Sequence, residues 1–77
     1  MSFAIKVFSY IENNYFKELT ITIISKAVNT SYSHTHKIIH FLEDKGYITL
    51  TKTGVKQIIT RTDKLFDILD FTGVLYK

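Results

Sequence analysis

Residues 19–48 read LTITIISKAVNTSYSHTHKIIHFLEDKGYI, and this stretch decides the fold. A threonine precedes an apolar segment of helical period, which predicts an N-capped helix over residues 21–28. The NTS sequence at 29–31 interrupts the period with side chains that bond to their own backbone, so a tight turn is expected there. A second helix is then expected over residues 31–45, because the period resumes and stops at Gly46, a residue type that ends helices.

This stretch resembles the core of winged helix-turn-helix regulators of the MarR- and ArsR-like kind. Their pattern, roughly L-T-x-x-x-L-A-x-x-x-x-x-S-x-x-x-V-x-x-x-I-x-x-L-E-x-K-G-L-I, aligns with residues 19–48 without a gap. The positions of matching type are Leu19, Thr20, Ile24, Ser31, Ile39, Leu42, Glu43, Lys45, Gly46 and Ile48. The chain departs from the pattern at Ser25, where alanine is usual, at Asn29, where glycine is frequent, and at Thr35, where an aliphatic residue is usual. Less specifically, the resemblance extends over most of the chain.

The expected fold class is α+β and mainly α: a winged helix-turn-helix with three helices, a two-stranded β-hairpin wing and a C-terminal helix. A chain of 77 residues forms one small domain, so residues 1–77 are assigned to a single winged-helix domain. The predicted elements are a helix over 3–13, a helix over 21–28, a recognition helix over 31–45, a wing hairpin over 47–61 and a C-terminal helix over 63–71.

The basic residues of the chain concentrate in its middle. The net charge is +3, but residues 20–62 carry six lysine or arginine residues against two acidic ones. Residues 1–19 are neutral overall and residues 63–77 carry a net charge of −1. This excess is either a generic solvated surface or a surface for a polyanion, and its coincidence with the helix-turn-helix stretch favours the polyanion.

The recognition helix divides its residues between the core and the DNA groove. If Thr35, Ile38, Ile39 and Leu42 point inward, the opposite face carries polar side chains that can contact DNA. The candidate DNA-binding residues on this face are Tyr32, Ser33, His36, Lys37 and His40. Because the helix has no arginine, bidentate recognition of guanine is missing and moderate specificity is expected.

After Gly46 the apolar period becomes alternating, which predicts two strands joined by a turn at Thr53-Gly54. The tip of this hairpin is short and carries two lysines, which suits a phosphate or the edge of a minor groove. The candidate DNA-binding residues of the wing are Lys52, Thr53 and Lys56. The alternative is a solvated edge hairpin protected by its lysines.

The two ends of the chain are apolar beyond what one small core requires. The helix over 3–13 is apolar on more than one face, and the helix over 63–71 has apolar residues opposite Asp63, Asp67 and Asp70. Either the domain covers these surfaces itself or a second copy does. A homodimer interface is predicted at Phe3, Val7, Tyr10, Phe66, Leu69, Val74 and Leu75.

The predicted function is sequence-specific binding of double-stranded DNA by a homodimer at an inverted repeat, regulating transcription. One alternative is a protein-interaction winged helix without DNA affinity. Another is a metal-responsive regulator that uses His36 and His40, which are one helical turn apart. The main hypothesis involves no metal, no cofactor and no membrane.

An enzyme is not expected, because the chain has no cysteine, no glycine-rich phosphate loop and no carboxylate–histidine cluster at catalytic spacing. The lack of cysteine, of a signal-peptide pattern and of a long apolar run favours an intracellular, cytoplasmic location. The proline-free composition, rich in isoleucine and lysine, suggests an AT-rich genome such as that of an archaeon or an archaeal virus.

Overall fold

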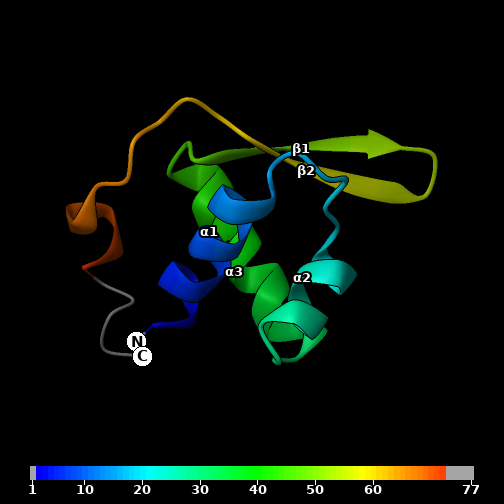
Figure 1. Cartoon of the computed structure of the whole chain (residues 1–77), viewed down its shortest axis with the longest axis horizontal. Coiled ribbons are helices and arrows are strands. Elements are labelled where there is room, and N and C mark those ends of the chain that lie inside the picture. Colours follow the sequence, from blue (N-terminus) through cyan, green and yellow to red (C-terminus); the bar gives the residue numbers. More distant parts are fainter. Residues whose placement is uncertain (1, 73–77) are drawn as a thin grey trace.

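The computed structural model describes residues 2–72 and shows a small, mainly helical α+β protein (Figure 1). Three helices precede a two-stranded antiparallel hairpin, and a short 3₁₀ turn follows it. Within residues 2–72, no helix has the length and apolar character needed to cross a membrane. The elements are α1 (Phe3–Asn14), α2 (Ile21–Ala27), α3 (Tyr32–Asp44), β1 (Ile48–Thr53), β2 (Lys56–Arg61) and the 3₁₀ turn η1 (Ile68–Phe71).

The three helices and the hairpin form where the sequence predicts them, and their ends differ from the prediction by one residue at most. A side-chain hydroxyl caps the N-terminus of each helix. Ser2 accepts a hydrogen bond from the Ala4 N–H, and Thr20 and Ser31 do the same for α2 and α3. Each cap satisfies one of the backbone donors that a helix leaves unpaired at its start.

Local backbone conformation and hydrogen bonds accommodate the three departures from the winged helix-turn-helix pattern, at Ser25, Asn29 and Thr35. Asn29 has a φ of 57°, in the left-handed region that asparagine tolerates better than most residues. Ser25 and Thr35 are both buried, at 7% and 0% exposure. Their hydroxyls donate to backbone carbonyls of their own helices, to Thr22 at 2.9 Å and to Ser31 at 2.9 Å. Small polar residues therefore fit the core without an unpaired hydroxyl.

The core lies where α1, α2 and α3 meet and continues under the base of the hairpin. The backbone N–H of Ile59 donates to the carbonyl of Leu19 at 2.9 Å, which ties β2 to the α1–α2 connection. Arg61 at the end of β2 also pairs with Glu12 of α1, with Nη2 3.0 Å from Oε2. The buried apolar residues are Ala4, Val7, Phe8, Ile11, Leu19, Ile21, Ile24, Val28, Ile38, Ile39, Leu42, Tyr47, Ile48, Ile59 and Phe71.

The α-helix predicted over residues 63–71 is wrong. Residues 62–67 are not helical, and only the four-residue turn η1 follows. Long-range hydrogen bonds hold this segment instead. The Thr62 hydroxyl donates to the carbonyl of Gly46 at 2.6 Å, and the Asp67 N–H donates to the Tyr47 hydroxyl at 2.9 Å. The Tyr47 hydroxyl in turn donates to Asp70 at 2.6 Å. These bonds to Tyr47 and Gly46 take the place of a helical ladder.

The carboxylate of Asp70 makes the stability of this segment dependent on pH. The hydrogen bond from Tyr47, followed by the one from Lys64, lowers the pKa of Asp70 from its ordinary value. A carboxylate with a lowered folded-state pKa stabilises the fold above its unfolded-state pKa, and this contribution is lost as the pH falls through the folded-state pKa. We therefore expect Asp70→Asn to be less stable than the wild type at pH 7, and the difference to shrink below about pH 5.

Urea unfolding at a series of pH values measures this difference. Tyr47→Phe serves as a second variant, because it removes the main cause of the lowered pKa while keeping the carboxylate. In Tyr47→Phe, the stabilising contribution of the Asp70 carboxylate should be lost at a higher pH than in the wild type. This account would be contradicted if the free energies of unfolding of the wild type and of Asp70→Asn differed by the same amount from pH 7 to pH 3.

Candidate nucleic-acid interface

The exposed side of α3 brings together the residues predicted to contact DNA. Thr35, Ile38, Ile39 and Leu42 are buried, which leaves the opposite side of this helix facing outward. The predicted residues on that side are Tyr32, Ser33, His36 and Lys37, which are exposed, and His40, which is partly exposed. A row of rings runs along the helix axis, because Tyr32 stacks on His36 and His36 contacts His40 with ring centroids 4.3 Å apart. Four buried side chains thus hold a continuous polar and aromatic surface in place.

The hairpin has a polar, exposed tip. In the antiparallel register, Lys52 lies opposite Gln57 and Thr53 lies opposite Lys56. All four side chains are exposed. Gly54 turns the chain with a φ of 62°, in the left-handed region where glycine carries no steric penalty. The hairpin therefore presents the predicted wing residues Lys52, Thr53 and Lys56 to solvent.

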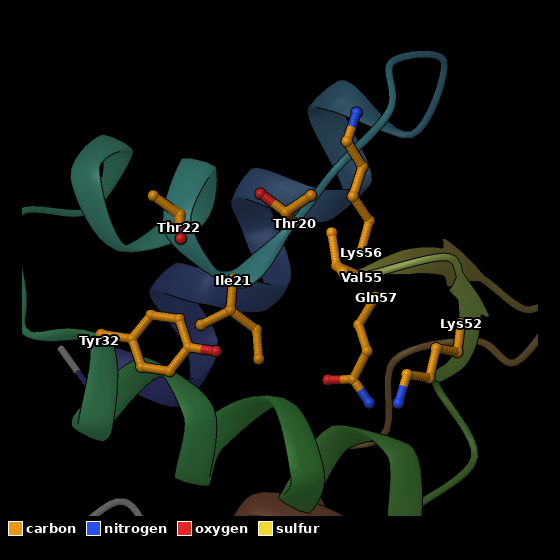
Figure 2. Close-up of a pocket in the computed structure, with 8 residues that line it drawn as sticks. All are labelled: Thr20, Ile21, Thr22, Tyr32, Lys52, Val55, Lys56 and Gln57. Carbon is orange, nitrogen blue, oxygen red and sulfur yellow. The ribbon is translucent and has the colours of Figure 1, made fainter.

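A groove separates the hairpin from the N-termini of α2 and α3 (Figure 2). In the close-up, the Tyr32 hydroxyl points into it from one side, and the ends of Lys52 and Gln57 lie on the other side. The Lys56 ammonium points away from the groove. The lining residues are Thr20, Ile21, Thr22, Tyr32, Lys52, Val55, Lys56 and Gln57. The groove therefore offers hydroxyl, amide and ammonium groups, which suit a sugar–phosphate strand.

Sequence reasoning missed part of this groove. Gln57 was not among the predicted site residues, although its pairing with Lys52 follows from a hairpin centred on Thr53-Gly54. Thr20 and Thr22 were also missed as site residues, because their place beside the hairpin depends on how α2 packs. The sequence therefore contains a signal that Gln57 lies beside Lys52. It contains no signal that Thr20 and Thr22 lie beside the hairpin.

Two of the six cations in residues 20–62 are paired with carboxylates. Arg61 pairs with Glu12, and this hydrogen bond raises the pKa of its guanidinium above the ordinary value. Lys56 lies 3.3 Å from Glu18, and both side chains are more than half exposed. Lys37 and Lys52 form no ion pair within residues 2–72. Lys37 on α3 and Lys52 on the hairpin thus add positive charge that no ion pair offsets within the described residues. The Lys56–Glu18 pair is exposed, so separating its two side chains costs little free energy.

The residues predicted for a dimer interface do not all lie on the surface. Val7 is fully buried in the core of its own chain, so its assignment to an interface is wrong. Phe3 and Tyr10 are partly buried, while Phe66 and Leu69 are exposed by 45% and 75%. The predicted interface residues Val74 and Leu75 lie outside the described residues. Sequence reasoning left out two further exposed apolar side chains of the same segment, Leu65 and Ile68.

Comparison with protein-family models gives no match for this chain, and comparison with curated proteins gives none either. The features of this chain that bear on function are the polar side of α3, the hairpin tip and the groove lined by Tyr32 and Lys52.

Proposed function

We propose that this protein is a winged helix-turn-helix regulator that binds double-stranded DNA in a sequence-specific manner. In this proposal α3 is the recognition helix and the hairpin is the wing. One observation carries it: Tyr32, Ser33, His36 and Lys37 share the exposed side of α3, and Lys52 lies across the groove from Tyr32.

The dimensions of α3 support insertion into the major groove. Its 13 residues make a rod about 20 Å long, and a helix with its side chains fits a groove about 12 Å wide. Residues near the start of the helix, Ser33 and His36, would reach base edges, where a hydroxyl or imidazole can bond to bases. Tyr32 lines the groove beside the hairpin, and in this proposal its hydroxyl would bond to a phosphate of the DNA backbone.

The charges support contact with phosphates on both sides of α3. Lys37 lies on α3 and Lys52 lies on the hairpin, and phosphate contacts from two elements fix the orientation of a protein on a duplex. Each phosphate that a lysine neutralises releases condensed counterions, so the affinity should fall steeply with salt. Two acidic residues lie beside this surface, Glu43 next to His40 and Glu18 next to Lys56. Asp70 instead bonds to Tyr47 and Lys64.

The proposal includes a homodimer that binds an inverted repeat. Its support is an exposed apolar segment formed by Leu65, Phe66, Ile68 and Leu69, all at least 45% exposed. An apolar surface of this kind on one small domain is typical of an interface. In a two-fold dimer the recognition helices would reach successive major grooves about 34 Å apart.

Selection from random DNA duplexes at two salt concentrations tests the function. We expect the wild type to select one sequence as an inverted repeat, with fewer bound duplexes at the higher salt. Ser33→Ala and His36→Ala should each relax the base preference at one position per half-site, by about 1–3 kcal/mol of discrimination.

His34→Ala is the matched control for His36→Ala. His34 lies on the same helix, but its ring packs edge-on against Phe3 with centroids 5.1 Å apart. This variant should keep the wild-type preference. If the selection enriches no sequence and the affinity does not depend on salt, DNA binding is refuted. A protein-interaction module is then the better hypothesis. Preferences unchanged by the Ser33 and His36 variants would refute the assignment of α3 to the groove.

A further inference from the structure

Two histidines on α3 lie at the separation of two ligands on one metal ion. The Nε2 atoms of His36 and His40 are 3.2 Å apart. Two zinc–nitrogen bonds of about 2.0–2.1 Å at a tetrahedral angle place their nitrogens about 3.3 Å apart. Without a metal, this contact between the two Nε2 atoms requires one ring to donate an N–H to the other. With a metal, the Nε2 lone pairs of both rings bind the ion.

Glu43 lies close to the second of these ligands. Its Oε1 lies 3.5 Å from Nδ1 of His40, one turn further along the helix. A carboxylate that accepts the other ring N–H is the usual partner of a metal-binding histidine, since it fixes the tautomer and the ring orientation. A proton on Nδ1 leaves the Nε2 lone pair of His40 on the side of His36.

We propose that His36 and His40 bind one zinc ion through their Nε2 atoms, with Glu43 orienting the His40 ring. Within residues 2–72 no group of three or more histidine, cysteine, aspartate or glutamate side chains could hold a metal. The ion therefore has two protein ligands, and water completes its coordination. Because both rings reach solvent, the site is open and the metal exchanges readily.

The zinc site stands independently of the proposed function, since it rests on two side chains and an orienting carboxylate. If α3 also contacts DNA, the bound ion adds positive charge to that surface. Loss of DNA binding with intact zinc binding would count against the proposed function alone. Loss of zinc binding with intact sequence preference would count against the metal site alone.

The test is a titration of the full chain with zinc chloride. Calorimetry measures the binding, and the ¹⁵N resonances of the imidazole rings show which nitrogens bind the metal. We expect one zinc ion per chain and shifts of the Nε2 resonances of His36 and His40. His36→Ala and His40→Ala should each remove the calorimetric signal, and Glu43→Gln should weaken binding by about ten-fold or more.

His34→Ala is again the matched control, because Nδ1 of His34 bonds to the Thr30 hydroxyl at 3.0 Å and its ring lies on another face of α3. This variant should bind zinc as the wild type does. Circular dichroism of each variant verifies that the helices are retained. Zinc binding that survives both His36→Ala and His40→Ala, or no shift of either Nε2 resonance at saturation, would overturn the proposal.

Discussion

Phe71→Ala should lower the free energy of unfolding by about 3–5 kcal/mol, the usual cost of removing a buried phenylalanine ring. Phe71 has no exposed surface, and its ring lies 5.1–6.2 Å, centroid to centroid, from the rings of Phe8, Phe41, Tyr47 and Phe66. Small domains are stable by only about 5–15 kcal/mol, so this single change should remove a large part of the total. Urea unfolding followed by circular dichroism measures it.

Leu69→Ala is the control within the same four-residue turn. Leu69 is 75% exposed in the single chain, so at protein concentrations too low for the proposed dimer the free energy of unfolding of this variant should stay within about 0.5 kcal/mol of the wild type. The contrast between two neighbouring apolar residues tests whether η1 closes the core through one ring alone. Equal losses for both variants, or no loss for Phe71→Ala, would show that the segment does not pack as described.

The combined variant Lys37→Ala with Lys52→Ala should weaken DNA binding by about 60-fold at 0.1 M salt. Each phosphate contact contributes about 0.9 to the slope of log affinity against log salt, which is about eight-fold in affinity at that concentration. The slope itself should fall by about two, and all sequences should be affected alike. Fluorescence anisotropy with a labelled duplex at several salt concentrations gives both quantities.

A charge-matched control separates the surface from the net charge. Lys6→Ala with Lys17→Ala removes two exposed cations that lie outside α3 and the hairpin. This control should change the affinity for DNA by less than about three-fold, because salt screens charges that lie more than about 10 Å from the phosphates. Equal losses for the two double variants would show that net charge, not the α3–hairpin surface, drives binding.

Local signals in the sequence were sufficient for the helices and the hairpin. Capping hydroxyls, the apolar period and Gly46 each act within a few residues, so their effect can be read from the chain alone. The departure at Asn29 also has a local cause, since the turn needs a residue that accepts a positive φ. The exposed side of α3 followed directly, because its four buried residues fix which side faces outward.

The C-terminal segment could not be predicted in the same way. Its apolar residues and Asp63 favour a helix locally, but the Tyr47 hydroxyl takes up the Asp67 N–H from 20 residues away. The pairing of Lys56 with Glu18 and of Arg61 with Glu12 is equally non-local. Counting charges along the chain therefore overstated the positive potential of the hairpin.

The attachment of β2 to the helices has a mechanical consequence. The hairpin is anchored at its root, where Ile59 bonds to Leu19 and Arg61 pairs with Glu12, whereas near its tip Lys56 forms an exposed ion pair with Glu18. Because these two contacts fix the root to the helices, we expect the hairpin to move more at its tip than at its root.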